Sequence, residues 1–557
     1  MSSDNLRTGG QLVAESLLVH DVDSVFCVPG ESYLEVLDAL YDQRNAIRVI
    51  SCRHEHGASN MAEAYGKLTG RPGICMVTRG PGACNAAIGV HTAFQDSTPM
   101  ILFIGQVGRE HLGREAFQEV DYVQMFTPLA KAVEQIEAVE DVPATIARAF
   151  QTAVSGRPGP VVLALPEDML RDVCETPMIN PAVIDERYPS LGDMERLHHI
   201  LGDCERPMVL VGGGGWSNQA RDDIIAFVEA NNLPVCCSFR RHDLFKNDHP
   251  NFAGEMGIAP NPKLVERVKN ADVLLVVGAR LGEMTTQGYT MLDEPVPTQH
   301  LVHVHTDKNE LGKVYQAVLA IHSSMNAFAA AARNLSPVES DHWNDFTQAA
   351  REDYLSGRVP SPYEGALNLG QVMADIDAML GDDGIVCVDA GNSSGWPQRF
   401  IPISGKRRLL GPTSGAMGYG VPAALAAKTV YPNRVVVACV GDGCFGMTGQ
   451  EISTGVKDGL NPVVLIFNNE MYGTIRLHQE RRHPDRVIAT DLNNPDYAAL
   501  ARASGAFGEV VEATEEFRPA LERALRSGLL AVIELRMDPD LISTRTTLSN
   551  LRGANSV

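Results

Sequence analysis

A carboxylate and an amide, each placed at the end of an expected strand, could together hold a divalent cation. Asp442 lies in the turn Gly441-Asp442-Gly443, directly after the β-branched run 434–440, and Asn469 follows the apolar run 462–467. In a parallel α/β unit the carboxyl ends of neighbouring strands face one crevice, so the two side chains should meet there. The glycines let the backbone approach a diphosphate, and carboxylate, amide and phosphate oxygens are ligands that Mg²⁺ prefers. We therefore predict a magnesium–diphosphate site.

The spacing of this pattern makes it more specific than its parts. A lone Gly-Asp-Gly is most often a tight turn that caps a helix, and here Ile452, Val456 and Leu460 predict a helix after the turn. The doubled Asn468-Asn469 at this distance, at the end of a strand, is typical of thiamine-diphosphate-dependent enzymes.

Size and composition limit the class of protein. A chain of 557 residues predicts three domains of about 150–190 residues. A net charge of −22 argues against nucleic acid or an anionic membrane as partner. We find neither an apolar run of ~18–20 residues nor the start of a secretory signal. The eleven cysteines are scattered without a Cys-x-x-Cys pair, which favours the reducing cytoplasm.

Strand and helix patterns alternate along the chain, which predicts an α/β fold of three doubly wound domains with mainly parallel sheets. We place the domains at 1–178, 190–335 and 362–557, separated by a Pro-rich linker near Thr176 and a loose stretch from Leu335 to Pro362. We predict strands at 24–28, 47–52, 73–78 and 160–165, at 207–211, 233–238 and 273–278, and at 434–440 and 462–467.

The first and third regions have a related layout. In each, a strand runs into a glycine turn and then a helix, at 74–82 and at 435–443, as after a duplication. In the middle region Gly212–Gly215 also follow a strand, but a dinucleotide fingerprint would need glycine where Ser217 stands. We interpret this segment as a flexible strand-to-helix turn.

Thiamine chemistry needs a carboxylic acid beside the far nitrogen of the cofactor's pyrimidine ring. Glu55 fits this requirement, because it follows an expected strand and opens a helix with an apolar face. Taken alone, Glu55 would be explained as an acid that interacts with a helix dipole.

The surrounding residues resemble the acetolactate synthase large subunit over nearly the whole chain. The resemblance is carried by Arg53–Ala58, Gly73–Asn85, Gly105–Val107, Ala116–Glu119, Ser155–Pro160 and Gly415–Ala424. It implies a pyrimidine-binding, a middle and a diphosphate-binding domain. It also implies that Glu55 of one subunit meets Asp442 of another, in a homodimer or homotetramer.

The resemblance further implies roles for single residues. Asp442, Asn469 and the carbonyl of Met471 would hold magnesium, Glu55 would activate the pyrimidine, and Met417 would be the bulky side chain beneath the cofactor. The remaining cofactor-binding residues would be Gly391, Asn392, Ser393, Gly441, Gly443, Cys444 and Tyr472. Phe117 and Gln118 match a substrate-facing pair, and Lys131 matches a lysine at the channel.

Four departures from this family affect the acceptor and flavin sites. A pocket tryptophan is replaced by His478, and a channel lysine by Glu167. The Arg-Phe-Asp-Asp-Arg segment reads Arg280–Met284, without its second arginine, and the flavin segment reads Met256–Pro262. Because a buried cation discriminates strongly for a carboxylate, we expect weak or absent acetolactate synthesis and no bound FAD.

Glu31 stands where acetolactate synthases have glycine. The corresponding loop of thiamine-dependent decarboxylases carries an acid used for proton transfer. Glu31 could equally be an acid at the start of the helix expected from Tyr33. His91, Gln95 and His478 are further candidates for proton transfer or substrate binding, each with a structural role as the alternative.

We thus predict an enzyme that uses thiamine diphosphate and Mg²⁺ to decarboxylate a small 2-oxo acid and to transfer or release the aldehyde unit. The alternative is a lyase or decarboxylase of an acyl-CoA or 2-hydroxy ketone, for which no carboxylate-binding arginine is needed. A catalytically silent thiamine-diphosphate-binding regulator is disfavoured by the presence of Glu55, Asp442 and Asn469.

Overall fold

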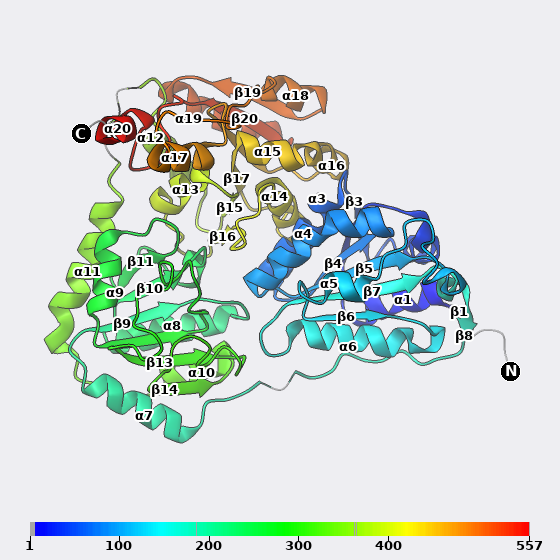
Figure 1. Ribbon diagram of the computed structural model, residues 1–557, viewed down its shortest axis with the longest axis horizontal. Helices are drawn as coiled ribbons and strands as arrows, with labels where there is room; N and C mark the ends of the chain where they lie inside the picture. The colour runs from blue at the N-terminus through cyan, green and yellow to red at the C-terminus, as the bar shows by residue number, and fades with distance from the viewer. Residues whose placement is uncertain (1–5, 185, 361–362, 364, 556–557) are drawn as a thin grey trace.

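The computed structural model describes residues 6–184, 186–360, 363 and 365–555. Three α/β domains follow one another along the chain (Figure 1), each with a six-stranded sheet whose paired strands all run parallel. The predicted fold class is therefore confirmed. No described helix is long and apolar enough to cross a bilayer.

The sheet of the first domain has the order β3-β2-β4-β5-β7-β6. Its strands are β2 (Ser24–Cys27), β3 (Arg48–Ser51), β4 (Gly73–Val77), β5 (Met100–Gln106), β6 (Ala132–Gln135) and β7 (Pro160–Pro166). Its helices are α1 (Gly9–Val19), α2 (Leu34–Asp42), α3 (Glu55–Thr69), α4 (Gly80–Asp96), α5 (Tyr122–Phe126) and α6 (Val142–Val154). One apolar core joins α1, α2 and α6 to one face of the sheet, and α3 and α4 cover the other face.

The sheet of the third domain repeats that order as β16-β15-β17-β18-β20-β19. Its strands are β15 (Ile385–Val388), β16 (Arg408–Leu410), β17 (Val436–Gly441), β18 (Val463–Asn468), β19 (Phe507–Val511) and β20 (Ala531–Arg536). Its helices are α12 (Leu369–Met379), α13 (Gly395–Phe400), α14 (Gly420–Val430), α15 (Asp442–Thr448), α16 (Ile452–Asp458), α17 (Gly473–Arg482), α18 (Tyr497–Ala503), α19 (Thr514–Ser527) and α20 (Leu548–Asn555). In both domains the strand order reverses between the first and third strands in the chain, and ligands of open parallel sheets bind at such a reversal.

The middle domain has a different order, β11-β10-β9-β12-β13-β14. Its strands are β9 (Pro207–Val211), β10 (Val235–Ser238), β11 (Phe252–Met256), β12 (Val273–Val277), β13 (His300–His305) and β14 (Leu319–His322). Its helices are α7 (Leu191–Gly202), α8 (Asn218–Ala230), α9 (Pro262–Asn270), α10 (Met325–Arg333) and α11 (Asn344–Gly357). This is the strand order of dinucleotide-binding folds, although the glycine turn after β9 lacks their full fingerprint.

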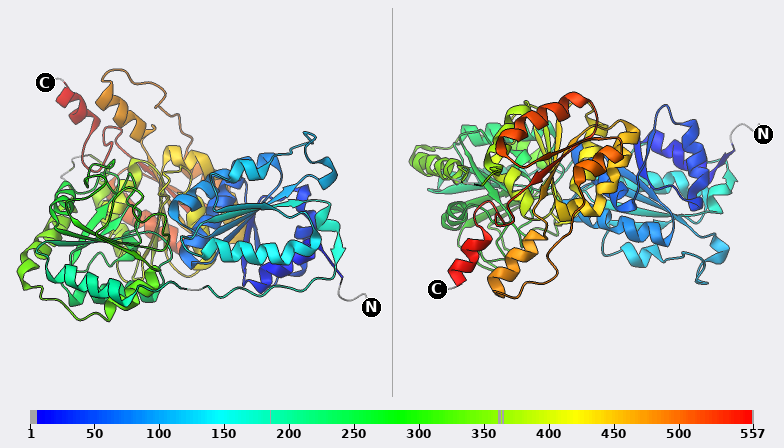
Figure 2. Two further views of the ribbon diagram at one scale, coloured as in Figure 1. Left: turned by 60° about the horizontal axis from the view of Figure 1, so that its bottom comes forward. Right: turned by 90° about the horizontal axis from the view of Figure 1, so that it is seen from above.

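The first and third domains share one continuous apolar core. Helices α3 and α14 pack face to face, and buried side chains of both domains, including Met61 and Leu425, belong to the same cluster. The middle domain lies to the side of this pair (Figure 2). Strand β8 (Val173–Cys174) pairs with β1 (Arg7–Thr8). The connector that follows runs from the first domain to α7, and its described residues, 175–184 and 186–190, form neither helix nor strand, as expected of a linker.

All three sheets fall inside the predicted domain ranges, whose exact boundaries stay predictions. Two sequence-based expectations were wrong. The stretch from Leu335 to Pro362 is not loose throughout, because it contains α11, and residues 361–362 lie outside the described part. The helix expected to include Leu460 ends at Asp458, because Gly459 adopts a left-handed conformation with φ of 65°.

The contact between β4 and α3 gives a test of this packing. A Cβ at Gly73 would lie 1.8 Å from the carbonyl oxygen of Ala62, whereas a Cβ at Gly202 would meet nothing within 4 Å. Gly73→Ala should therefore lower the free energy of unfolding by an overpacking cost of about 3 kcal/mol, and the unfolding midpoint should fall with it. The matched Gly202→Ala, in α7, should leave the midpoint unchanged or raise it slightly. Equal midpoints in thermal denaturation followed by circular dichroism would contradict the close packing of β4 on α3.

Candidate active site

A cavity of about 250 Å³ opens at the carboxyl edge of the third sheet, where the strand order reverses between β15 and β17. Every residue of this domain that we predicted to bind cofactor lines it: Gly391, Asn392, Ser393, Met417, Gly441, Asp442, Gly443, Cys444, Asn469, Met471 and Tyr472. The rest of the lining is largely apolar and includes Trp396, Phe467, Leu541 and Ile542. The structure thus brings these residues together, while their individual roles stay predictions.

Asp442 is the charged group of the cavity and is only 3% exposed. Its Oδ1 accepts a hydrogen bond from the backbone N–H of Gly443 at 2.8 Å, and its Oδ2 accepts one from Nδ2 of Asn494 at 2.9 Å. Burial raises the pKa of this carboxyl above its ordinary value. A buried carboxylate is stabilised when a cation binds beside it.

The two adjacent asparagines do different work, which the sequence did not reveal. Asn468 accepts from Asn494 at 2.9 Å and donates to Oε1 of Glu534 at 2.9 Å, so it belongs to a buried brace behind Asp442. Asn469 lines the cavity. Sequence reasoning missed Asn494 and Glu534, because neither lies in a motif and only the fold brings them to this edge.

Residues 470–472, after β18, are hydrogen-bonded to residues 490–492, and Met471 and Tyr472 line the cavity. The N–H of Tyr472 donates to the carbonyl of Thr490 at 2.8 Å, and the N–H of Leu492 donates to that of Glu470 at 2.8 Å. Glu470 has a positive φ of 56°, which a side-chain-bearing residue rarely adopts. This pairing holds Met471, the third predicted metal ligand, against the cavity wall.

The cavity fits a diphosphate and a hard cation. A Cβ at Gly443 would lie 2.7 Å from the Tyr472 ring, and one at Gly441 would lie 3.2 Å from Oγ of Ser393, so glycine keeps this cradle open. Among the described residues, no group of three or more His, Cys, Asp and Glu side chains forms a metal site. Mg²⁺ is commonly bound by one or two carboxylates and completed by phosphate oxygens, as the Asp442 site would require.

The turn that follows Met417 is held by a buried carboxylate. Asp389 accepts hydrogen bonds from the N–H groups of Gly418 at 2.9 Å and Gly420 at 2.7 Å. Burial raises the pKa of Asp389, and Gly418 has a φ of 84° that favours glycine. The turn that follows Met417 is therefore rigid, as a side chain that supports a ligand requires.

The first domain places Glu55 at the carboxyl end of β3, as the first residue of α3. Its Oε2 accepts from Nδ2 of Asn85 at 2.9 Å. Glu55 does not line the 250 Å³ cavity of its own chain. Asn85, which lies one turn into α4, has no role predicted from the sequence.

Two more predicted catalytic residues lie at the same edge of the first sheet. Glu31 follows β2, and its Oε1 accepts from Nη1 of Arg79 at 3.0 Å. The carbonyl of Gln118 accepts from the N–H of Gly80 at 2.9 Å, and the φ of Gln118 is 64°. Phe117, beside it, is 75% exposed, so this loop presents an apolar side chain outward.

Other candidates are not brought to the cavity. His478 is exposed on α17 and does not line it. Lys131 lies at the amino edge of the first sheet, where its ammonium donates to the carbonyls of Thr152 and Ser155, and burial lowers its pKa to about 8. His91 and Gln95 lie on α4, and the carbonyl of Gln95 accepts from Arg280.

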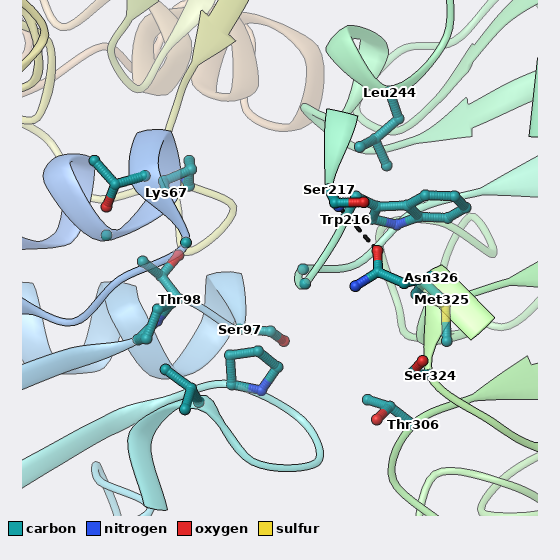
Figure 3. Close-up of a pocket in the computed structure, with 18 of the residues that line it drawn as sticks. Lys67, Ser97, Thr98, Trp216, Ser217, Leu244, Thr306, Ser324, Met325 and Asn326 are labelled. Carbon is teal, nitrogen blue, oxygen red and sulfur yellow. Dashed lines mark hydrogen bonds between the residues drawn. The ribbon is translucent and has the colours of Figure 1, made fainter. Parts of the chain in front are cut away.

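A second cavity, of about 890 Å³, lies between the first and middle domains (Figure 3). Lys67, Ser97 and Thr98 face it from the first domain, and Trp216 and Ser217 face it from the turn after β9. The N–H of Ser217 donates to Oδ1 of Asn326 at 3.0 Å, which closes the turn against α10. This cavity is large enough for a nucleotide-sized ligand.

Comparison with known proteins identifies the class that this fold and site define. The N-terminal TPP binding domain of thiamine pyrophosphate enzymes matches residues 7–125, the central domain 194–332 and the C-terminal TPP binding domain 389–535. The chain therefore belongs to the thiamine pyrophosphate enzymes, and its cofactor is thiamine diphosphate.

Within this family the chain is similar to acetolactate synthases. It is 32% identical to the acetolactate synthase large subunit of Corynebacterium glutamicum, over 93% of this chain and 84% of that one. It is 31% identical to the acetolactate synthase isozyme 2 large subunit of Escherichia coli K12, over 93% of both. It is 28% identical to a probable acetolactate synthase large subunit of Methanocaldococcus jannaschii, over 95% and 92%. The predicted resemblance is confirmed.

The burial of Asp442 predicts how cofactor binding depends on pH. Mg²⁺ would bind the ionised carboxylate, and burial raises the pKa of Asp442, so protons should compete with the metal at pH values above 3.8, the ordinary pKa. Thiamine diphosphate affinity at fixed Mg²⁺ should fall as the pH is lowered through that raised pKa. Quenching of Trp396, which lines the cavity, provides the measurement.

Asp442→Asn should abolish the Mg²⁺ dependence at every pH, whereas the exposed Asp293→Asn of the middle domain should leave it unchanged. Full Mg²⁺-dependent binding by Asp442→Asn would remove Asp442 from the metal site.

Proposed function

We propose that this thiamine-diphosphate-dependent enzyme binds its cofactor with Mg²⁺ and decarboxylates a small 2-oxo acid, then transfers or releases the aldehyde unit. The observation that carries the proposal is the single cavity that gathers Asp442, Asn469 and Met471 beside the glycine turn. The cofactor, when bound, supplies an acidic carbon and an electron sink for the carbon next to a carbonyl.

The residues of the chain would supply orientation, protons and a dry environment. Glu55 would hydrogen-bond to the pyrimidine ring, held in place by Asn85. Met417 would support the cofactor from its rigid turn. The largely apolar lining would disfavour the substrate's carboxylate in its charged form and so favour loss of CO₂.

We also propose that two chains share each site, in a homodimer or homotetramer. Glu55 lies outside the cavity of its own chain, so a second chain is needed to bring its carboxylate to the cofactor. The exposed Phe117 and the open carboxyl edge of the first sheet form a surface suited to that contact.

Complementation between variants tests this arrangement. Glu55→Gln should keep cofactor binding and lose turnover by about 100-fold or more, because an essential hydrogen-bonding acid is gone. Asp442→Asn should lose cofactor binding. Mixed, unfolded together and refolded, the two variants should recover about a quarter of the sites, since half the dimers then hold one intact pair. No recovery from a mixture that reassembles would place Glu55 and Asp442 of one chain in the same site.

The acceptor and flavin sites of acetolactate synthase are altered in this chain. Met284 stands in the place of an arginine and is 38% exposed, and Arg280 is engaged with the carbonyl of Gln95. Glu167 stands in the place of a lysine and is paired with Arg79. We infer that no carboxylate-bearing acceptor is held here and that FAD is absent, although the 890 Å³ cavity leaves room for a nucleotide.

Purified enzyme supplied with pyruvate, thiamine diphosphate and Mg²⁺ should form little or no acetolactate, and the protein should show no flavin absorption in the visible range. Both measurements use one preparation, and cofactor binding on the same sample controls for folding. Acetolactate formed at the rate of a bona fide synthase, or a yellow protein, would refute this part of the proposal.

A second function fits the same departures. A lyase or decarboxylase of an acyl-CoA or 2-hydroxy ketone needs no arginine for a substrate carboxylate, which agrees with Met284 and Glu167. Screening 2-oxo acids, 2-hydroxy ketones and acyl-CoA compounds by CO₂ release and product mass separates the two functions.

The eleven cysteines are all unpaired thiols and nine are buried, which suits the reducing cytoplasm that we propose.

A further inference from the structure

The first domain has its own strand-order reversal, between β2 and β4. The equivalent point of the third domain, between β15 and β17, carries the cofactor cavity. Because ligands of open parallel sheets bind at such points, the residues that follow β2 and β4 are placed to contact a ligand. The proposed function uses Glu55, after β3, and leaves the arginine after β4 without a ligand.

Three charged residues from three strand ends meet beside this reversal. Arg79 follows β4, and its side chain is 9% exposed. Its Nη1 donates to Oε1 of Glu31, after β2, at 3.0 Å, and its Nη2 donates to Oε2 of Glu167, which directly follows β7. The guanidinium thus reaches across the end of β5 and joins two carboxylates. We call these three residues the Arg79 cluster.

The Arg79 cluster has unused hydrogen-bonding capacity of both kinds. A guanidinium has five N–H donors, of which two are used, and Nε is buried with no partner in the described part of the chain. Glu31 is 68% exposed, and its Oε2 accepts no hydrogen bond from any described residue. Buried ionic donors are normally satisfied, so the cluster is incomplete without a further group.

The cluster and Glu55 lie on either side of the first turn of α4. Arg79 immediately precedes this helix, and a Cβ at Gly82 would lie 3.5 Å from Oε1 of Glu55. The loop of Gln118 is fastened to the same turn through Gly80. If Glu55 holds the pyrimidine ring of the cofactor, as we propose, a substrate bound to that cofactor reacts at the same edge of the first sheet as the Arg79 cluster.

The charges of the cluster select among substituents of a substrate. Two carboxylates and one guanidinium leave a net negative charge, and Arg171 approaches Glu167 only at 4.0 Å from an exposed position. The net negative charge would repel a substrate carboxylate. An alkyl group would leave the unused groups of Arg79 and Glu31 without a hydrogen-bond partner. A hydroxyl can accept from Arg79 and donate to Glu31 at once.

We propose that the Arg79 cluster binds a hydroxyl group of the substrate, so that the preferred substrate is a hydroxylated 2-oxo acid. This inference rests on the proposed function, since it names the substrate class of the same site. Arg79 and Glu31 are then specificity-determining residues, and Glu167 is a positioning residue that holds the guanidinium in place.

Three acids that differ at one carbon test the proposal: pyruvate with CH₃, hydroxypyruvate with CH₂OH and mesoxalate with COO⁻. Decarboxylation of hydroxypyruvate takes up one proton and releases CO₂ and glycolaldehyde. With holoenzyme containing thiamine diphosphate and Mg²⁺, kcat/KM from CO₂ release should be about tenfold or more higher for hydroxypyruvate than for pyruvate. Mesoxalate should be the poorest of the three.

Variants of the cluster should change the ratio of kcat/KM for hydroxypyruvate to kcat/KM for pyruvate, rather than turnover alone. Arg79→Met and Glu31→Ala should bring that ratio close to one, and Arg79→Lys should retain part of it. The matched controls are Arg148→Met and Glu134→Ala, an exposed ion pair of the same domain, which should keep the wild-type ratio. Should Arg79→Met fail to fold, as shown by lost cofactor binding, Glu31→Ala and Arg79→Lys carry the test.

The outcomes distinguish failure of the proposed function from failure of the inference about the substrate hydroxyl. Failure of wild-type protein to bind thiamine diphosphate with Mg²⁺ overturns the proposed function and this inference with it. Cofactor binding together with an equal or higher kcat/KM for pyruvate or mesoxalate overturns the inference alone, as does binding without turnover of any of the three acids. An unchanged ratio in Glu31→Ala and Arg79→Lys would also overturn it.

Discussion

The active site depends on the register between β17 and β18. Gly441 lies opposite Phe467, so that Asp442 and Asn468 leave the sheet side by side. Because successive residues of a strand point to opposite sides, the two asparagines cannot share one task. Asn468 turns back into the brace with Asn494 and Glu534, and Asn469 reaches the cavity. A shift of one residue would exchange these roles and leave a carboxylate buried without its partners.

The first and third domains use one strand order for two purposes. Where the order reverses in the third domain, glycines and a buried carboxylate line the cavity in which we propose that phosphate and metal bind. At the corresponding place in the first domain, the charged side chains of Glu31 and Arg79 lie beside the glycines. The shared order agrees with the duplication inferred from the two strand–turn–helix patterns. The fold supplies the location, and the residues at the strand ends supply the chemistry.

The sequence predicted the fold class, the strands that carry the motifs and a set of residues that gather around the 250 Å³ cavity, whose roles stay predictions. These features are local, since glycine turns and apolar runs predict turns and strands from neighbouring residues alone. Residues whose partners are distant in sequence were missed: Asn494 contacts Asp442 across 52 positions, and Arg79 contacts Glu167 across 88. The helical spacing that includes Leu460 failed because one glycine in a left-handed conformation ends α16.

The expectation of a loose stretch after Leu335 failed for another reason. Helix α11 has a weak apolar face and is stabilised by packing on β11 and α9, which no local pattern reports. His478 was singled out from its place in a family motif, but the turn of α17 that carries it faces outward. Spacing along a helix fixes its faces relative to one another and leaves open which of them is covered.

The junction between α3 and α14 has a mechanical consequence. Lys67 bridges Glu63 and Asp96 in the junction, and all three side chains are almost fully enclosed. The hydroxyl of Tyr419 donates to Glu63 at 2.6 Å from the third domain. Opening the junction would break the hydrogen bonds that Tyr419 and Thr413 donate to these carboxylates and would expose the shared apolar core to water. The first and third domains of one chain are therefore joined through a continuous core, which disfavours their separation. In the shared sites that we propose, substrate exchange would then depend on motion between subunits.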